Sequence, residues 1–335
     1  MICFDKAYGC LAGLALGDAL GMPTEFLTPE RIVAEYGVLK GLVAAAGWHP
    51  HAALPLGSVT DDTAQALALA GIYLRGDPMT AQHVAQALLA WADAQAARLD
   101  LYAGPSTKKA LAALRNGADP RESGRQGTTN GAAMRIAPVG IVHTGDFEAT
   151  LADTVEACLP THGTTLAISA AAAVACAVSE AMTETATLNS VLEAARHGAA
   201  EGRLHGAYVW TPALEHRIDL AVRLVHEAAD EATARDALYR YIGVDIAVTE
   251  TIPTVFGLVA LANGDPMRAI FHAARIGGDT DTIGAIAGAV CGALSGIGAI
   301  DRAVLATVER ANKLDLAHVA RGLINAAQRI GPKMA

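Results

Sequence analysis

Aromatic residues are scarce in this chain: they account for only 4% of its residues, whereas hydrophobic residues as a whole account for 52%. The core must therefore consist mainly of Ala, Leu, Val and Ile. Small side chains favour closely packed helices, and Ala has the highest helix propensity. The sequence also lacks the apolar–polar alternation of a half-buried strand, and no linker divides it. We therefore predict a compact all-α protein in which residues 1–335 form a single domain.

Positive charge is also in short supply. The chain has 25 Lys and Arg residues against 34 Asp and Glu residues, which gives a net charge of −9. The basic residues form no cluster, and this argues against nucleic acid or an anionic membrane as a partner. An anionic substrate would need local help from metal ions and from helix N-termini.

The cysteines show no CxxC spacing, although the chain has five of them: Cys3, Cys10, Cys158, Cys176 and Cys291. Three lie in apolar helical runs, so we expect buried free thiols, which suit a reducing cytosol. The chain also opens without a basic, apolar and cleavable leader, because Asp5 and Lys6 interrupt its start. We therefore expect a cytoplasmic protein. Nothing in the sequence indicates an oligomeric state.

One uncharged run, Ile283–Ile300, has 18 residues and approaches the length of a transmembrane helix. An acidic cluster adjoins it and the chain offers no second candidate span, so we predict a buried core helix. Residues 5–21 form a second helical run, and in both runs glycines recur every four residues. Glycines at this spacing form one smooth helix face, and such faces pack closely. We expect these two helices to lie against each other. The glycines are Gly9, Gly13, Gly17 and Gly21, and Gly284, Gly288, Gly292 and Gly296.

Two short motifs of carboxylates and hydroxyls each open directly into an apolar run. They are Ser58–Thr63 (SVTDDT) and Ile276–Ile283 (IGGDTDTI), more than two hundred residues apart. Carboxylates are costly to bring together unless something positive joins them. A hard divalent cation such as Mg²⁺, Mn²⁺ or Ca²⁺ takes an all-oxygen ligand set of this kind. Our hypothesis is one metal centre built from two distant halves.

Each motif alone also has simpler interpretations. Ser, Thr and Asp at the start of an apolar helix are typical N-terminal caps. An EF-hand would need Asp or Asn and later Glu at the places that Ile283 and Val290 occupy, so it fails. A phosphatase with an aspartyl nucleophile would need its acidic pair after a buried strand, whereas His272–Arg275 is typical of a helix. Capping and a metal centre therefore both stay open.

Other polar residues stand at the ends of predicted helices. Asp18 and Glu25 lie near the end of the first helix, which Pro23 stops, and the simpler interpretation is that both are polar side chains exposed to solvent. The segment Asp119–Asn130 is a polar loop that runs into a small-residue helix start, where bare N–H groups could face phosphate.

The predicted helices 147–159 and 164–184 are joined by Pro160–Gly163. This places His162 at a helix entrance, where it would contact an anion or, by default, cap the helix. The segment Gly202–Arg217 is irregular and indicates no chemistry.

Several separate blocks together resemble the ADP-ribosylglycohydrolases, a family that includes the dinitrogenase reductase-activating glycohydrolases. The blocks occur in the family's order over roughly residues 6 to 300, and the combination of TDD with GGDTDT is highly specific. They are Gly13–Phe26 (GLALGDALGMPTEF), Thr60–Thr63 (TDDT), Asn130–Arg135 (NGAAMR), Thr161-His162 and Gly277–Thr282 (GGDTDT).

The resemblance implies an orthogonal all-α bundle with two divalent cations, Mg²⁺ or Mn²⁺, at the floor of a cleft. It places Glu25 where the family has an active-site glutamate, with Asp61 and Asp62 as further catalytic residues. The implied metal ligands are Thr60, Asp61, Asp62, Asp279, Asp281 and Thr282. The residues implied to bind the pyrophosphate and ribose are Asn130, Gly131, Ala132, Met134, Arg135 and His162.

The implied reaction is hydrolysis of the bond at ribose C1 of an ADP-ribosyl group, on a protein or on a small compound. Carboxylates stabilise the oxocarbenium character that develops, two metals grip ribose hydroxyls and polarise water, and Glu25 acts as general base or proton shuttle. The family's usual Gly-Asn-Gly is here Gly127-Thr128-Thr129-Asn130-Gly131, which we expect to reshape the phosphate or adenine end of the pocket.

Two other functions stay open. One is a catalytically silent module that binds ADP-ribose or a nucleotide, which the intact ligand set and Glu25 argue against. The other is a hydrolase of a small ribosyl, nucleoside-type metabolite.

Overall fold

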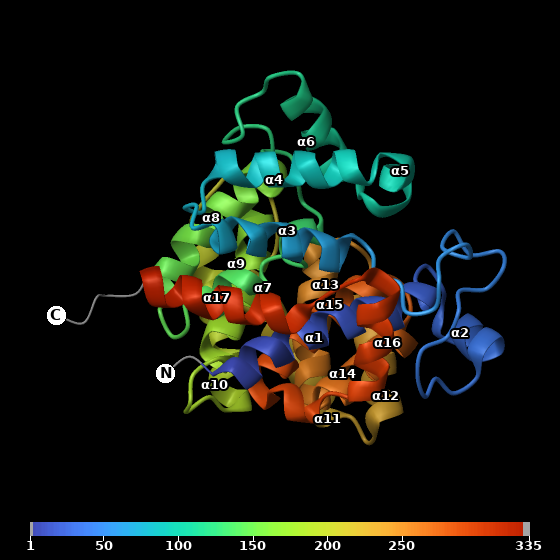
Figure 1. The fold of residues 1–335 in the computed structure, drawn as a ribbon. Helices are drawn as coiled ribbons and strands as arrows, with labels where there is room; N and C mark the ends of the chain where they lie inside the picture. The colour runs from blue at the N-terminus through green and yellow to red at the C-terminus, as the bar shows by residue number, and fades with distance from the viewer. Residues whose placement is uncertain (1–2, 331–335) are drawn as a thin grey trace.

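A computed structural model describes residues 3–330, and this part of the chain is all-α, as predicted (Figure 1). It contains seventeen α-helices and no β-strand, only the isolated bridges Thr129↔Ala247 and Thr164↔Ala207. The helices are α1 (Phe4–Gly21), α2 (Pro29–Tyr36), α3 (Asp61–Arg75), α4 (Ala81–Ala94), α5 (Leu99–Tyr102), α6 (Pro105–Arg115), α7 (Ala137–Val142), α8 (Phe147–His162), α9 (Thr165–Ala181), α10 (Leu188–Gly202), α11 (Leu214–Glu227), α12 (Glu231–Ala237), α13 (Val248–Leu261), α14 (Pro266–Ile276), α15 (Thr280–Ser295), α16 (Arg302–Asn312) and α17 (Leu316–Ile330).

The centre of the fold is the antiparallel pair α1 and α15, whose glycine faces meet backbone to backbone (Figure 1). A Cβ atom added at Gly13 would lie 2.0 Å from the carbonyl oxygen of Gly288, and one added at Gly17 would lie 2.0 Å from that of Gly284. The predicted contact between the two glycine-rich helices is therefore confirmed. Because α1 ends at Gly21 beside Thr280, this pairing brings the turn that carries Glu25 next to the start of the second acidic motif.

The remaining helices surround this pair with small apolar side chains. One hydrophobic cluster extends along the chain from Ala7 to Ala327, and α9 contributes an almost fully buried run of alanines. A separate small cluster of Leu27, Ile32, Leu39 and Ala274 lies beneath α2. The single domain over residues 1–335 stays a prediction, which the continuous cluster supports.

The uncharged run Ile283–Ile300 is not one helix. The α15 helix ends at Ser295, because Gly296 adopts φ 73° and glycine in this left-handed region terminates helices. A 3₁₀ turn, Ile297–Ala299, follows. The prediction of a buried core helix therefore holds for α15 itself. Gly296 follows the last helical residue but still contacts α1, because a Cβ added at Gly9 would lie 2.6 Å from its carbonyl carbon. In the part of the chain that the structure describes, no helix has both the length and the hydropathy needed to cross a membrane.

Two predictions of helix ends are wrong: the end of the helix before His162 and the helix start in the small-residue segment. The α8 helix continues through Pro160 to His162, so His162 lies in its last turn and not at the entrance of α9. This is possible because Gly124 donates its N–H to the carbonyl of Leu159 at 3.1 Å and so holds the end of α8 in place. The small-residue segment forms only one 3₁₀ turn, Asn130–Ala132, and α7 begins later, where a proline stands in the first turn.

The irregular segment predicted for Gly202–Arg217 is shorter than expected. It ends where α11 begins at Leu214, because Leu214 and Ile218 are already buried on the apolar face of that helix.

Candidate functional site

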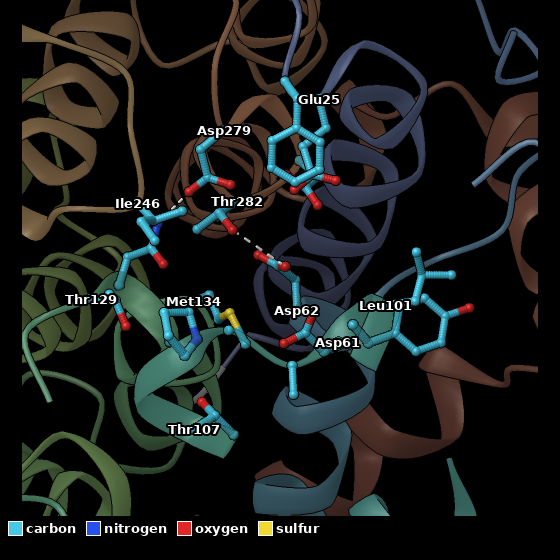
Figure 2. A pocket seen from close by; sticks show the side chains of 18 of the residues that line it. Glu25, Asp61, Asp62, Leu101, Thr107, Thr129, Met134, Ile246, Asp279 and Thr282 are labelled. Carbon is cyan, nitrogen blue, oxygen red and sulfur yellow. Dashed lines mark hydrogen bonds between the residues drawn. The ribbon is translucent and has the colours of Figure 1, made fainter. Parts of the chain in front are cut away.

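The two acidic motifs open into one cavity of about 250 Å³ (Figure 2). Its floor comes from the first turns of α3 and α15 and from the turn after α1, and its rim includes α5 and the segment before α6. The residues that line it are Glu25, Phe26, Asp61, Asp62, Asp100, Leu101, Tyr102, Ala103, Gly104, Pro105, Thr107, Thr129, Asn130, Gly131, Met134, Ile246, Asp279, Asp281 and Thr282.

The first motif is held from outside by Asp18 of α1. Thr60 is the N-cap residue of α3, but its side chain makes no capping hydrogen bond. Instead, the Asp18 carboxylate accepts hydrogen bonds from the N–H of Thr60 at 2.9 Å, from its hydroxyl at 2.9 Å and from the N–H of Thr63 at 3.1 Å. Because Asp18 accepts hydrogen bonds from the backbone N–H groups at the start of α3, the side chains of Asp61 and Asp62 are free to face the cavity.

The second motif depends on two consecutive glycines in the left-handed region, Gly277 with φ 89° and Gly278 with φ 71°. The N–H of Gly278 donates to Leu27 at 2.9 Å, and that of Asp279 donates to Val244 at 2.8 Å. Asp279 precedes α15 without a capping hydrogen bond from its side chain. Neither Thr60 nor Asp279, the N-cap residues of the two motifs, therefore acts as a side-chain cap, and the simpler interpretation of these motifs fails.

The two motifs meet through hydroxyl groups. The Asp62 Oδ2 atom accepts hydrogen bonds from Thr60 at 3.2 Å and from Thr282 at 3.4 Å (Figure 2). One carboxylate oxygen from each of Glu25, Asp279 and Asp281 lies within 4.8 Å of the other two, a spacing at which they could share a metal ion. The two halves that the sequence separates therefore form one acidic cluster.

This cluster is electrostatically strained without a cation. Burial raises the pKa of Glu25, Asp62 and Asp281 well above the ordinary values, and the neighbouring carboxylates raise them further. Burial is also the main cause that raises the pKa of Asp61 well above its usual range, and it raises the pKa of Asp279 to about 6.

Two buried oxygen atoms in the cluster have no hydrogen-bond partner among residues 3–330: Oδ1 of Asp62 and Oδ1 of Asp281. Buried polar atoms are normally satisfied, and unpaired carboxylate oxygens are costly. A hard divalent cation would satisfy both atoms and neutralise the repulsion, and the all-oxygen donor set fits such a cation.

Three of the residues expected to bind substrate do line the cavity: Asn130, Gly131 and Met134. Asn130 also has a second task, because its amide nitrogen donates to the Asp279 carboxylate and, at 3.0 Å, to the Thr251 hydroxyl. It therefore fixes the orientation of a predicted metal ligand. Ala132 is buried and lies outside the lining.

Arg135 and His162 lie behind the cavity wall and not on it, since both side chains are fully buried. The Arg135 guanidinium donates to Gln65 at 2.9 Å and to Thr161 at 2.6 Å, and the Gln65 amide donates to Asp61 at 3.0 Å. Arg135 thus supports a predicted ligand through one intermediate side chain.

His162 supports the opposite part of the wall. Its Nε2 atom lies 3.0 Å from the Thr129 hydroxyl, and its Nδ1 atom lies 2.7 Å from the Thr161 hydroxyl. Burial lowers the pKa of His162 well below its usual range, so the ring is neutral. A neutral and enclosed imidazole offers no charge to a phosphate group.

Sequence analysis missed several residues of the site. Leu101, Tyr102 and Thr107 line the rim, and the only local signal near them is the Gly104-Pro105 break. His51 is not among the predicted site residues, yet its Nε2 atom lies 3.1 Å from Oε2 of Glu25. A pair of histidines two positions apart, His49 and His51, was the signal that could have indicated it.

Comparison with known proteins identifies a family and several relatives of this chain. The family model described as ADP-ribosylglycohydrolase matches residues 2–332. The uncharacterized protein YegU of Escherichia coli (strain K12) is 35% identical over 332 residues, which are 97% of this chain and 98% of that protein. A solved structure described as an ADP-ribosylglycohydrolase-related protein complex has a TM-score of 0.72 at 25% identity, and the match covers 97% of this chain and 98% of the other.

Two relatives whose names state an activity match over shorter stretches. The ADP-ribosyl-[dinitrogen reductase] glycohydrolase of Rhodospirillum rubrum is 28% identical over 148 residues, 43% of this chain and 48% of that protein. The ADP-ribosylarginine hydrolase Tri1 of Serratia proteamaculans (strain 568) is 31% identical over 170 residues, 47% and 42% of the two chains. The family match, in contrast, covers nearly the whole sequence. The chain therefore belongs to the ADP-ribosylglycohydrolase family.

Proposed function

We propose that this chain is a metal-dependent glycoside hydrolase that cleaves the bond at ribose C1 of an ADP-ribosyl group, carried by a protein or by a small compound. The observation that carries the proposal is the acidic cluster, in which Asp62 and Asp281 each keep a buried oxygen without a partner. Membership of a hydrolase family supports the type of reaction.

Two divalent cations, Mg²⁺ or Mn²⁺, fit the donor set better than Zn²⁺, because the donors are oxygens and no cysteine is among the residues that line the cavity. Bound there, the cations would polarise water and grip vicinal ribose hydroxyls. Thr282 donates its hydroxyl proton to Asp62, and the single hydroxyl proton of Thr60 has Asp18 at 2.9 Å and Asp62 at 3.2 Å as acceptors. The oxygen lone pairs of both hydroxyls are therefore available. The residues that would hold the cations are Thr60, Asp61, Asp62, Asp279, Asp281 and Thr282.

Glu25 has the position of a proton shuttle. Its carboxylate lines the cavity, and one of its oxygens is held by His51. In the proposed step the oxygen of water bonds to C1, and Glu25 accepts the proton that this water loses. The bond from C1 to the leaving group breaks, and Glu25 returns the proton to the leaving group. Asp61 and Asp62 stabilise the positive charge that develops at C1.

One observation favours a second candidate, hydrolysis of a small ribosyl metabolite of the nucleoside type. The cavity of about 250 Å³ lies below the roughly 300–1,000 Å³ of typical ligand pockets. Six carboxylates and no Lys, Arg or His side chain are among its lining residues, so a diphosphate finds no positive side chain there. An ADP-ribosyl group would have to extend past Pro105 into the neighbouring cavity of about 710 Å³, which Lys109 and Arg125 line.

A product assay by mass spectrometry tests these functions. Purified protein with Mg²⁺ or Mn²⁺ is incubated with ADP-ribosyl-arginine, ADP-ribosyl-serine, O-acetyl-ADP-ribose and simple nucleosides. Release of ADP-ribose supports the first proposal, and release of ribose from nucleosides supports the second. A silent binding module would bind ADP-ribose and release no product from any substrate, and that result would refute both.

We further propose a cytoplasmic location and no nucleic acid partner. All five cysteines are free and four of them are buried, which suits a reducing compartment. The net charge of −9 disfavours binding to a polyanion. Cell fractionation and a DNA- or RNA-binding assay test these two statements.

A further inference from the structure

A histidine from the loop after α2 holds the proposed proton shuttle. Within residues 3–330, the side chain that hydrogen-bonds the Glu25 carboxylate is that of His51, with 3.1 Å between Nε2 and Oε2. The His51 side chain is 2% exposed and that of Glu25 is 11% exposed. Water therefore competes little for this contact, and the imidazole decides how the carboxylate is oriented.

His49 locks the same loop to the backbone of Glu25. Its Nε2 atom lies 3.0 Å from the carbonyl oxygen of Glu25, and its Nδ1 atom accepts the backbone N–H of His51 at 3.2 Å. A carbonyl oxygen can only accept and a backbone N–H can only donate, so the His49 proton must be on Nε2. His49 is thus a neutral clamp that places His51 beside Glu25.

The tautomer of His51 follows from its other nitrogen. Nδ1 of His51 is buried and has no hydrogen-bond partner in the part of the chain that the structure describes. A buried N–H without an acceptor is rarer than a buried acceptor without a donor, so the proton belongs on Nε2, where it points at Oε2 of Glu25. The imidazole then donates a hydrogen bond to the carboxylate, and the second oxygen, Oε1, is left free.

Both flanks of this loop are anchored. The hydroxyl of Tyr36 accepts the N–H of Ala46 at 3.0 Å and donates to the carbonyl of Pro23 at 3.0 Å, which ties the loop to the turn that carries Glu25. On the other side, the ring of His51 is stacked on that of Tyr102, with 16° between the ring planes, and Tyr102 lines the cavity. His51 therefore joins the proton shuttle to the cavity rim.

We propose that His51 is a positioning residue for catalysis: its Nε2–H holds Oε2 of Glu25 so that Oε1 faces the attacking water, and His49 keeps His51 in that tautomer and place. The inference rests on the proposed function, because it assigns His51 a task only if Glu25 moves the proton. The competing interpretation is that His51 is an ordinary buried polar residue that stabilises the loop.

Two substitutions separate these interpretations. His51→Phe keeps a flat ring against Tyr102 but removes the donor. His51→Gln places an amide nitrogen the same number of bonds from Cα and so restores the donor. We expect His51→Phe to lower kcat about 100-fold with KM within about threefold of the wild type, because misplacing a catalytic group costs about this factor. His51→Gln should recover most of that loss.

His143→Phe is the matched control. His143 is also a buried histidine on a carboxylate, with 2.7 Å between its Nε2 and Oδ2 of Asp153, but neither residue lines the cavity. The His143→Phe substitution should lower the melting temperature and leave kcat unchanged. Equal kcat in His51→Phe and wild type, or a loss in His51→Gln as large as in His51→Phe, would overturn the inference and leave the proposed function intact.

A spectroscopic measurement tests the contact without turnover or metal. Long-range ¹H–¹⁵N correlation spectra of the metal-free protein should show His51 as the Nε2–H tautomer, and Glu25→Ala should shift that signal. A His51 ring protonated on Nδ1 would overturn the proposed geometry. If the wild type hydrolyses no substrate, the proposed function fails, and the catalytic task of His51 fails with it.

Discussion

The Thr282 hydroxyl donates a hydrogen bond of 3.4 Å to Oδ2 of Asp62, although 220 positions separate the two residues. This contact joins the first turns of α15 and α3 at the floor of the cavity. It exists because the glycine faces of α1 and α15 meet, and because Asp18 on α1 holds the start of α3. Each acidic motif therefore needs the other to form a site.

Asp281→Asn should reduce bound metal and lower turnover by orders of magnitude, because it removes one charge from the ligand set. The melting temperature of the metal-free protein should rise, since the substitution relieves carboxylate repulsion. Asp62→Asn should act alike, and the double variant should be little worse than either single. Metal analysis, turnover and thermal melts measure these effects.

Asp265→Asn is the control for that series, because the Asp265 side chain caps α14 by accepting a hydrogen bond from the backbone N–H of Arg268. Asn caps about as well as Asp, so this variant should resemble the wild type. Unchanged metal content and turnover in both cluster variants would show that the cluster holds no catalytic metal.

The metal-free protein should lose stability as the pH rises from about 4 to about 6. Burial raises the pKa of Asp279 from the ordinary 3.8 to about 6. Within this window the folded state keeps a proton that the unfolded state has released, so raising the pH favours unfolding. The full shift of the Asp279 pKa corresponds to a loss of about 3 kcal/mol in the free energy of unfolding. Urea denaturation at about pH 4, 5 and 6 measures this change in stability.

The same experiment with saturating Mg²⁺ should show a weaker pH dependence, because a cation favours the ionised carboxylates. Asp279→Asn should weaken the dependence of the free energy of unfolding on pH in the metal-free protein. Metal-free stability that increases from about pH 4 to about pH 6 would contradict the prediction.

Chelation should abolish turnover, and Mg²⁺ or Mn²⁺ should restore it. The cation binds the folded state alone, so a concentration 100 times the dissociation constant should stabilise the protein by about 2.7 kcal/mol. Differential scanning calorimetry across a metal titration measures this shift. Full turnover in protein shown to be metal-free by elemental analysis would refute metal dependence.

Gly13→Ala should lower the free energy of unfolding by roughly 3 kcal/mol or more, because the added Cβ would lie 2.0 Å from the carbonyl oxygen of Gly288. The backbone at Gly288 cannot move away from the added Cβ unless α1 and α15 separate. Gly71→Ala in α3 is the matched control, since its Cβ would meet only Arg75 Nη1 at 3.4 Å, and it should stabilise α3 by up to about 1 kcal/mol. Equal stability of the two variants would contradict the close packing.

Arg135→Lys should destabilise the fold by roughly 3 kcal/mol, because a lysine cannot replace the forked hydrogen bonds of a buried guanidinium. KM should hardly change, since Arg135 is fully buried and does not line the cavity. Thermal melts and steady-state kinetics separate these effects. A large rise in KM at unchanged stability would instead indicate the direct substrate contact that the family resemblance implies.

The helical class, the pairing of two glycine-rich helices and the acidic residues of the cluster could all be predicted from the sequence alone. These are local signals. A four-residue glycine spacing makes one smooth face on any helix, and a run of carboxylates and hydroxyls limits the chemistry wherever the chain places it.

Only the tertiary structure decided which side chains reach the cavity. In the motif Thr280-Asp281-Thr282, the Thr280 hydroxyl turns back to the carbonyl of Gly21 at 2.9 Å, whereas Thr282 faces Asp62. Arg135 lies behind the cavity wall, although the family resemblance implied that it binds substrate. Tyr102 lines the cavity, although no pattern in the sequence indicated it. The reason is physical: helix periodicity depends on neighbours a few positions away, whereas the lining of a site depends on how helices and loops distant in the chain pack together.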